Sequence, residues 1–447
     1  MASPQITANS RAPDAPREPT VRWVLAATLI SGLSGFVVML LAVRALGSSG
    51  YAVFGVFWSS LFLIVGILFG IQQETTRATA VETELRAVAE SGKTAPPVRR
   101  RPRRSLWVFA ALVAAGVVAV VLVSGIWWAP ATLGAEHAGL VLQVAIGAGA
   151  NVFVATLSGV FAGAHRWRHL AAVIGLDGIF RFAAVVGAVL VGGDLQELAW
   201  AVILPFPLSL AVVVLASPRT TMSISWTSLG FGRLLVNSGH TVIAATAMAL
   251  IVNGFPMVLA FFGHPEQQDE LGSLILAITF TRAPVLVPLF ALQSYLITRF
   301  TTSPLSPWRL IGQTFAVIGI AMATLGGATA LWGRVAFDWI SRGDFLLSSA
   351  ALVPLVVSSG VIGALCVTGA ALVARGQHRE YAAGWIVAAV VSIVVLFIPL
   401  SLETRAALAL STGPLVGLTV QCGFLRRRLR TEGKLADRPG TDSQSGR

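Results

Sequence analysis

The sequence WVLAATLISGLSGFVVMLLAV, residues 23–43, contains no charged side chain and has the length of a membrane-spanning helix. About 20 apolar residues in a helix cross the roughly 30 Å hydrocarbon layer of a bilayer. Because the run lacks a cleavage site of small residues and exceeds a signal-peptide core, it predicts an anchor that remains in the membrane. Eleven further runs of this kind follow it: 51–71, 106–126, 140–162, 170–191, 198–215, 235–261, 271–297, 310–332, 352–373, 382–400 and 406–425.

The composition agrees with a protein surrounded by lipid. Of 447 residues, 55% are hydrophobic and 12% are charged, and the mean hydropathy is +0.78. A soluble domain carries about 25% charged residues, so a soluble enzyme is excluded. The two cysteines, Cys366 and Cys422, lie in apolar runs, which argues against a disulfide framework and against a thiolate metal site.

The distribution of Lys and Arg predicts the orientation in the membrane. With the N-terminus in the cytoplasm, 26 of the 32 basic residues fall on the cytoplasmic side and 4 on the other. Loops that stay in the cytoplasm carry such an excess, so both termini are expected there, in a multi-pass protein of the cytoplasmic membrane. We expect this organisation: a disordered tail over 1–21, a six-helix lobe over 22–217, a linker over 218–232, a second six-helix lobe over 233–429 and a disordered basic tail over 430–447.

Two arginine clusters, 99–104 and 426–430, account for much of the net charge of +12. They either fix the topology or attract anionic lipid headgroups, at about 1 kcal/mol for each basic residue near such a surface. Nucleic acid is not an expected partner, because the chain has no soluble domain to present this charge.

The predicted external loops are short, and the chain lacks the usual catalytic motifs. It has no Walker A loop, no HExxH pair, no GxSxG elbow and no cluster of Cys and His. We therefore expect neither an enzyme nor a bound metal or cofactor. A polytopic helical bundle of this kind is most simply a transporter or a channel.

The two halves of the chain resemble one another weakly and in register. His165-Arg166 lies between the fourth and fifth runs, and His378-Arg379 lies 213 residues later, between the tenth and eleventh. Coincidence within apolar sequence is the alternative. Repeats of six spans each would be parallel and related by an axis along the membrane normal.

Three segments resemble Wzx-type polysaccharide flippases of the multidrug/oligosaccharidyl-lipid/polysaccharide exporter (MOP) superfamily. They are LAVRALGSSGYAVFGVFWSSLFLIVGILFGIQQETTR (41–77), LSGVFAGAHRWRHLAAVIGLDGIFR (157–181) and the stretch 253–288, which contains TFTRAPVLVP. The resemblance implies alternating access between two six-helix lobes and movement of a lipid-linked oligosaccharide or polysaccharide precursor, with envelope polysaccharide synthesis enzymes as partners.

The chain departs from two branches of that superfamily. Its first run holds no charge until Arg44 at its end, which disfavours a peptidoglycan precursor as substrate. Neither the first nor the seventh run contains an Asp or Glu, which disfavours a multidrug exporter.

Three ionisable side chains lie deep within predicted spans: Arg282, Arg181 and Asp177. Such groups are costly in the hydrocarbon and are functional candidates for that reason. We predict that Arg282, with Arg181, binds the diphosphate of a polyprenyl-linked sugar, since the planar guanidinium pairs two phosphate oxygens at once. Alternatively, Asp177 and Arg181, at i and i+4, form an intrahelical ion pair.

Weaker candidates remain, and so do two rival functions. Asn151, Asn253, Gln293 and Gln313 are candidates for lining a sugar path, although such residues also join helices to one another. A cation-coupled drug or small-molecule antiporter would use Asp177 as its coupling acid. A non-transporting scaffold of cell-envelope assembly would pair its buried arginines inside closely packed helices.

Overall fold

The structure is a computed structural model, and it describes residues 18–90, 104–227, 231–264, 267–302, 306–343 and 347–436. Within these ranges the chain is almost entirely helical, as the sequence predicted. The first half comprises α1 (Glu18–Glu90), β1 (Arg104–Ser105), α2 (Leu106–Thr132), a 3-10 turn (Ala135–His137), α3 (Leu140–Gly163), α4 (Trp167–Leu190), α5 (Leu195–Ile203), α6 (Pro205–Ala216) and α7 (Pro218–Ile224). The second comprises β2 (Trp226–Thr227), α8 (Phe231–Ala249), a π-helix (Leu250–Gly254), α9 (Phe255–Ala260), α10 (Gln268–Ala291), α11 (Gln293–Thr302), α12 (Pro307–Ser341), α13 (Ser349–Val373), α14 (His378–Leu396) and α15 (Leu402–Ala436).

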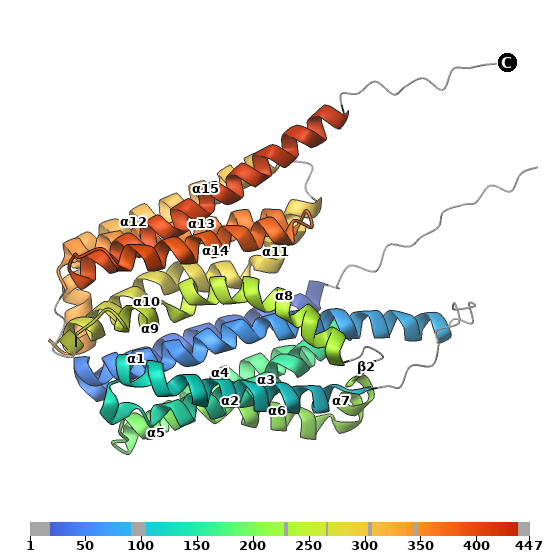
Figure 1. Ribbon diagram of the computed structural model, residues 1–447, viewed down its shortest axis with the longest axis horizontal. Coiled ribbons are helices and arrows are strands. Elements are labelled where there is room, and N and C mark those ends of the chain that lie inside the picture. The colour runs from blue at the N-terminus through green and yellow to red at the C-terminus, as the bar shows by residue number, and fades with distance from the viewer. Residues whose placement is uncertain are drawn as a thin grey trace, which may run out of the picture.

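The first two predicted spans form a hairpin within α1. Gly47, with φ of 69°, interrupts the helical backbone between them. Glycine carries no Cβ and adopts a positive φ without steric cost. The two arms then pack side by side, so that the Tyr51 hydroxyl donates a hydrogen bond to the Met39 sulfur at 3.7 Å. The second arm extends beyond the bundle toward its own C-terminal end (Figure 1).

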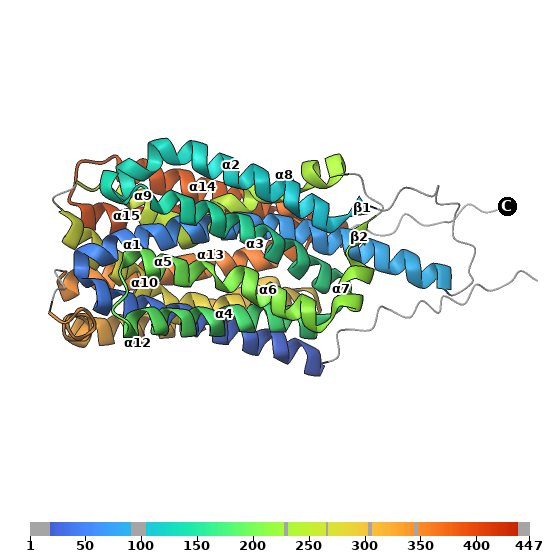
Figure 2. The same cartoon turned by 90° about the horizontal axis from the view of Figure 1, so that it is seen from below.

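In the part of the chain that the structure describes, ten helices are long and apolar enough to cross a membrane, and α1 counts once among them although it contains two predicted runs. The seventh predicted run is divided among α8, the π-helix and α9, whose apolar part covers Ala245–Ala260. The helices run along the long axis of the molecule in both ribbon views (Figures 1 and 2). The chain is therefore an all-α, multi-pass membrane protein.

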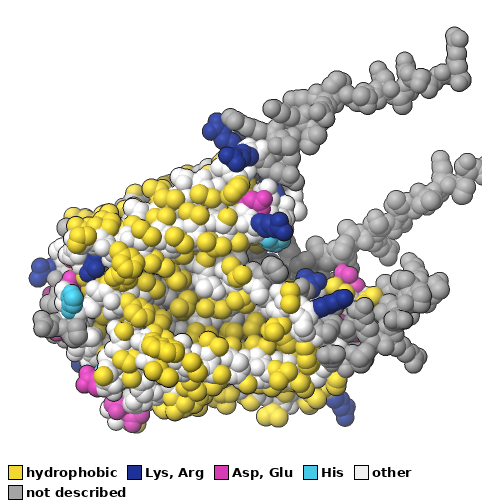
Figure 3. All heavy atoms as spheres, viewed as in Figure 1, with side chains coloured by type: hydrophobic (Ala, Val, Ile, Leu, Met, Phe, Trp, Pro, Cys, Tyr) yellow, Lys and Arg dark blue, Asp and Glu magenta, His cyan; other side chains and the backbone are white. Residues whose placement is uncertain are grey.

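The surface of the molecule has an apolar middle and polar ends. Hydrophobic side chains cover the centre of the face in Figure 3, while Lys, Arg, Asp and Glu gather at its two ends. The beginning of α1 and the end of α15 lie at the same end, on the right in Figure 1. Which end faces the cytoplasm stays a prediction. We call this end the terminal end and the other the distal end.

The first helix, α1, lies in the middle of the bundle, between the two halves of the chain. The helices α2–α7 lie on one side of α1, the helices α8–α10 on its other side, and α11–α15 beyond them (Figure 1). A short antiparallel ladder pairs Arg104 with Thr227 and Ser105 with Trp226, and so ties the connection between the halves to the start of α2.

Some predictions concern residues beyond the described ones. Of the tail predicted over 1–21, the structure describes only the part from Glu18, where α1 begins. Of the tail predicted over 430–447, it describes only the part up to Ala436, where α15 ends. Most of the arginine cluster at 99–104 also lies outside the described residues.

Candidate functional site

Arg282 lies in the middle of α10, is only 5% exposed, and faces the junction between α8 and α9. Its Nη1 donates a hydrogen bond to the carbonyl oxygen of Ile251 at 2.9 Å. The guanidinium carbon lies 5.7 Å from the centre of the Phe255 ring. The hydrogen bond and the Phe255 ring thus hold Arg282 against the segment that joins α8 to α9, which is distant from it in the sequence.

The acceptor is available because the helix is irregular at this point. Ile251 belongs to the π-helix Leu250–Gly254, in which a carbonyl accepts from the N–H five residues later. That residue is Pro256, which has no N–H to donate. The side chain of Arg282 supplies the missing donor. The pairing therefore satisfies a backbone carbonyl within the membrane, where no water is available to do so.

The rest of the guanidinium has no acceptor among the described residues. Nε and Nη2 of Arg282 are buried and make no hydrogen bond. An arginine carries five N–H donors, and a buried donor without a partner costs about 1–3 kcal/mol, more for a charged group. Arg282 lines a cavity of about 230 Å³ between α1, α10 and the π-helix region. We call this the central cavity.

The central cavity has a mostly apolar wall with a few polar groups. Its lining includes Met39, Trp58, Ser59, Asn253, Pro256, Ile278, Thr279 and Leu286 in addition to Arg282. No Asp or Glu is among the described residues that line it. Among the described residues that line the cavity, Arg282 is therefore the one ionisable side chain, and no carboxylate of the lining neutralises it.

Hydrogen bonds join α1 to the π-helix along one side of this cavity. The Ser59 hydroxyl donates to the Asn253 carbonyl oxygen at 2.6 Å and accepts from the backbone N–H of Met257 at 3.2 Å. Nδ2 of Asn253 donates to the carbonyl oxygen of Phe62 at 3.2 Å. Asn253, predicted to line a sugar path, therefore lies on the cavity wall and also joins two helices.

Arg181 and Asp177 form the intrahelical pair considered as the alternative. Nη2 of Arg181 donates to both carboxylate oxygens of Asp177, at 2.6 and 2.7 Å. Arg181 is 3% exposed and its guanidinium carbon lies between 5.0 and 6.0 Å from the ring centres of Phe206, Phe62 and Trp58. Trp58 lines the central cavity, whereas Arg181 and Asp177 do not. The structure thus does not bring Arg181 and Arg282 into one cavity.

The other predicted residues lie elsewhere. Asn151 is buried in α3, and Gln293 is half-buried at the start of α11. Gln313 is exposed on α12 and lines a separate groove beside α11. None of the three is among the residues that line the central cavity.

The distal side of the cavity is closed by packing between the halves of the chain. Phe36 on α1 packs on Phe280 of α10 with ring centres 4.2 Å apart, and Phe280 contacts Phe337 of α12 at 6.2 Å. A Cβ at Gly272 would overlap the carbonyl oxygen of Ser48, so glycine allows α10 and α1 to meet there. The contact of Ser48 with Gly272 lies between the cavity and the distal end, whereas Phe36 and Phe280 pack at the level of the cavity.

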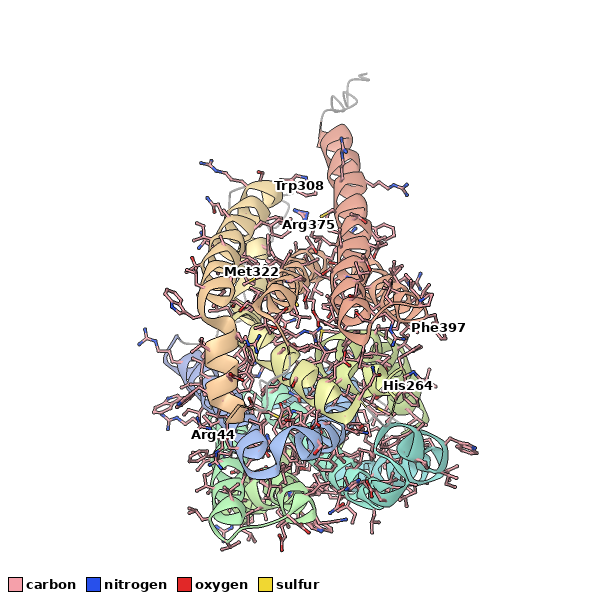
Figure 4. All side chains as sticks on the ribbon, turned by 90° about the vertical axis from the view of Figure 1, so that its left-hand side faces the viewer. Arg44, His264, Trp308, Met322, Arg375 and Phe397 are labelled. Carbon is pink, nitrogen blue, oxygen red and sulfur yellow. The ribbon has the colours of Figure 1, made fainter. Side chains whose placement is uncertain are left out.

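Arg44 adds a polar contact at the same end. Its Nε and Nη2 donate to the carbonyl oxygens of Ile340 and Trp339 at 3.3 and 3.4 Å, and its guanidinium carbon lies 4.2 Å from the centre of the Trp339 ring. The last carbonyls of a helix lack intrahelical donors and attract cations. Figure 4 shows α12 running from Trp308 to a position beside Arg44, so α12 reaches α1 at its C-terminal end.

No protein-family model matches the chain. An uncharacterized protein of Mycobacterium bovis is 34% identical over 405 residues, which are 90% of each chain. An uncharacterized protein of Mycobacterium tuberculosis is 33% identical over 422 residues, or 92% of each chain. The chain belongs to the family of these mycobacterial proteins. The family likeness includes most of the apolar runs, since it extends over nine-tenths of the chain.

Solved structures show which fold this member of the family has. An inward-facing multidrug resistance MATE family transporter of the MOP superfamily aligns with a TM-score of 0.67 at 14% identity, over 94% of this chain and 100% of that one. The lipid II flippase MurJ in an inward closed conformation gives 0.64 at 11% identity, over 90% and 87%. An outward-facing MATE family transporter gives 0.61 at 16% identity, over 94% and 98%.

The fold is therefore the one that these MOP-superfamily transporters have, which confirms the fold that the resemblance implied. The narrower likeness to Wzx-type flippases stays a prediction.

Several residues of the site were not predicted from the sequence. Trp58 and Ser59 line the cavity, and Ile251 contributes only its backbone, which no side-chain pattern reveals. One signal was present: Gly254 and Pro256 stand within the seventh apolar run and weaken its helix. An irregular helix within a membrane is tolerated where it is buried in protein or lines a cavity.

Proposed function

We propose that this protein is a flippase or exporter that moves a lipid-linked oligosaccharide or polysaccharide precursor across the cytoplasmic membrane. Arg282 would bind the diphosphate of the substrate in the central cavity. The lobes 22–217 and 233–429 would rock against each other by alternating access, with both termini in the cytoplasm. Envelope polysaccharide synthesis enzymes would supply the substrate.

One observation carries this proposal: Arg282 is buried beside a cavity with two nitrogens that lack an acceptor. A buried charge without a partner costs several kcal/mol, and an arriving anion would offset this cost. Phosphate suits the guanidinium because the two remaining nitrogens match two oxygens. The cavity, about 230 Å³, is below the roughly 300–1,000 Å³ of sites for drug-sized ligands and fits a diphosphate better than an oligosaccharide.

The rival functions have less support. A cation-coupled antiporter needs an acid that faces the cavity, whereas Asp177 is bonded to Arg181 through both oxygens. A scaffold needs Arg282 paired within packed helices, whereas this side chain borders an open volume. Both observations favour recognition of an anionic substrate.

The test is transport of a fluorescent polyprenyl diphosphate-linked sugar in proteoliposomes. Arg282→Ala is expected to lower the initial rate about tenfold to a hundredfold, since hydrogen bonds to a charged group contribute about 1.5–3 kcal/mol. Arg282→Lys keeps the positive charge but lacks the planar pair of N–H donors, so its transport rate should be intermediate. Arg334→Ala, which removes an exposed arginine at the distal end, is the matched control. An unchanged rate in well-folded Arg282→Ala protein would remove Arg282 from the mechanism.

A further inference from the structure

A second hollow lies at the distal end, where α1 of the first half of the chain meets the last turns of α12 in the second half. It has a volume of about 560 Å³, and it is lined by Arg44 on α1 and by Val335, Asp338, Trp339, Arg342 and Gly343 at the end of α12. We call it the distal hollow. Figure 4, which views the molecule from this end, shows Arg44 beside the C-terminal part of α12. The distal hollow thus belongs to both halves of the chain and shares no lining residue with the central cavity among the described residues.

Two arginines and one carboxylate surround the distal hollow. Arg44 uses its Nε and Nη2 for carbonyl oxygens at the end of α12, and its Nη1 makes no hydrogen bond to a described residue. The side chains of Asp338 and Arg342 likewise form no hydrogen bond or ion pair with any residue that the structure describes. A ligand in the distal hollow therefore has two guanidinium groups and one unpaired carboxylate within its reach.

The backbone at the end of α12 holds one of these arginines in an unusual conformation. Arg342 has a φ of 60°, in the left-handed region that residues other than glycine rarely adopt. The N–H groups of Arg342 and Gly343 both donate to the carbonyl oxygen of Asp338, which closes the last turn. An arginine thus stands where glycine is the favoured residue. Such outliers concentrate at functional sites, and this one lines the distal hollow.

The distal hollow lies at the depth that lipid headgroups occupy. Trp332 and Trp339 are 63% and 69% exposed, and exposed tryptophans of membrane proteins concentrate at the level of the headgroups. Leu331 and Val335 precede Trp339 by two turns and one turn, on the same side of α12, and both are exposed. A ligand with its polar part in the distal hollow can therefore lay an apolar chain along α12. A membrane lipid has this shape, and a soluble molecule does not.

The charges around the distal hollow select among lipid headgroups. A phosphate suits Arg44 and Arg342, because a guanidinium pairs well with phosphate oxygens. The carboxylate of Asp338 repels a phosphate and instead suits a cation that donates hydrogen bonds. Phosphatidylethanolamine carries a phosphate and a primary ammonium in one headgroup. Phosphatidylglycerol lacks the ammonium, and the quaternary ammonium of phosphatidylcholine has no N–H to donate.

We infer that the distal hollow binds the headgroup of phosphatidylethanolamine, with its phosphate at Arg44 and Arg342 and its ammonium at Asp338. Because these residues come from α1 and α12, the bound lipid also holds the two halves of the chain together at the distal end. A ligand that binds one arrangement of a protein better than another shifts the equilibrium toward it. The lipid therefore regulates transport by favouring the closed distal end, and this consequence rests on the alternating access of the proposed function.

The test measures lipid binding to the purified full-length protein by native mass spectrometry. The probes are phosphatidylethanolamine, phosphatidylglycerol and phosphatidylcholine with identical acyl chains. Arg44→Gln, Arg342→Gln and Asp338→Asn each remove one charge of the distal hollow. Arg334→Gln is the matched control, since it removes an exposed arginine of the same helix that is not part of the lining. Soluble phosphoethanolamine and inorganic phosphate serve as competitors, which distinguish a lipid headgroup from a free anion.

The wild-type protein and Arg334→Gln should bind phosphatidylethanolamine about fivefold more tightly than either other lipid, which is the effect of one half-exposed ion pair. Asp338→Asn should lose this preference and keep its affinity for phosphatidylglycerol. Each arginine variant of the distal hollow should bind both of these lipids about fivefold more weakly. Arg282→Ala should bind phosphatidylethanolamine like the wild type, so the result does not depend on the proposed transport site.

Equal affinities for the three lipids, or a preference that survives in Asp338→Asn, would overturn the inference. Displacement by soluble phosphoethanolamine at lipid-like concentrations would show that the distal hollow takes a soluble ligand instead. The regulatory consequence has its own readout: spin labels at the exposed positions Glu136 and Ser401, on connections at the distal end, in protein without its two cysteines. Their separation should be shorter in nanodiscs of phosphatidylethanolamine than of phosphatidylglycerol. Lipid binding with an unchanged separation would refute the regulation and leave the binding site.

Discussion

Arg282 and Ile251 are joined by a hydrogen bond of 2.9 Å between a side chain of α10 and a backbone carbonyl of the π-helix that precedes α9. The bond uses one nitrogen of the guanidinium, and the other two lack an acceptor in a side chain that lines the central cavity. An irregular stretch of backbone and a buried cation thus stabilise one another.

Replacing Pro256 with Ala should weaken the site without weakening the fold. The new N–H at position 256 competes with Arg282 for the Ile251 carbonyl, because it stands where a π-helical donor belongs. We expect transport of the fluorescent polyprenyl diphosphate-linked sugar to fall about tenfold, the effect of one charged hydrogen bond. The melting temperature should be unchanged or higher. Pro354→Ala, within α13, is the control, and equal losses in both variants would contradict the prediction.

The Asp177–Arg181 pair should contribute to stability rather than to transport. Asp177→Asn leaves a buried guanidinium without its counter-ion, which destabilises a protein by about 3–5 kcal/mol. We expect a lower melting temperature in detergent for Asp177→Asn and recovery in the double variant Asp177→Asn/Arg181→Met. If the recovered double variant is folded but inactive, the pair takes part in transport, as the antiporter hypothesis requires.

Gly272→Ala should loosen the distal end. The added Cβ overlaps the Ser48 carbonyl oxygen, and overpacking of this kind costs about 1–3 kcal/mol. A cysteine at Ile278, which lines the central cavity, should then react with an impermeant thiol reagent added outside intact cells, after Cys366 and Cys422 are replaced by Ser. Gly319→Ala has open space around its Cβ and should leave Ile278→Cys protected. Equal labelling in the two backgrounds would show that Gly272 does not maintain the closed end.

The orientation predicted from charge can be measured with two single cysteines in the same cysteine-free background. Glu136→Cys lies in the connection between α2 and α3, at the distal end, and should be labelled in intact cells. Arg168→Cys, near the start of α4, should be labelled only after the membrane is permeabilised. The reverse pattern would place both termini outside and would contradict the positive-inside assignment.

Whether a contact could be predicted depended on how far apart in the sequence its two partners lie. The intrahelical alternative for Asp177 and Arg181 required only the spacing i, i+4, and the structure has that contact. The partner of Arg282 lies 31 residues away and is a carbonyl. No pattern of side chains predicts which backbone carbonyl a buried arginine will reach.

The sequence by itself determined which stretches form the apolar helices and that Arg282, Arg181 and Asp177 lie within them, although α12 and α15 extend well beyond the predicted runs. It did so because a backbone in hydrocarbon must satisfy its hydrogen bonds within its own helix, so apolar length alone specifies a span. Only the tertiary structure decided that Arg282 borders a cavity and that Arg181 lies behind Trp58. Helices in lipid associate through close packing and interhelical hydrogen bonds, since lipid chains are as apolar as the side chains they replace. The fit of Gly66 against Ala249, and of Gly272 against Ser48, depends on three-dimensional shape and cannot be read from hydropathy.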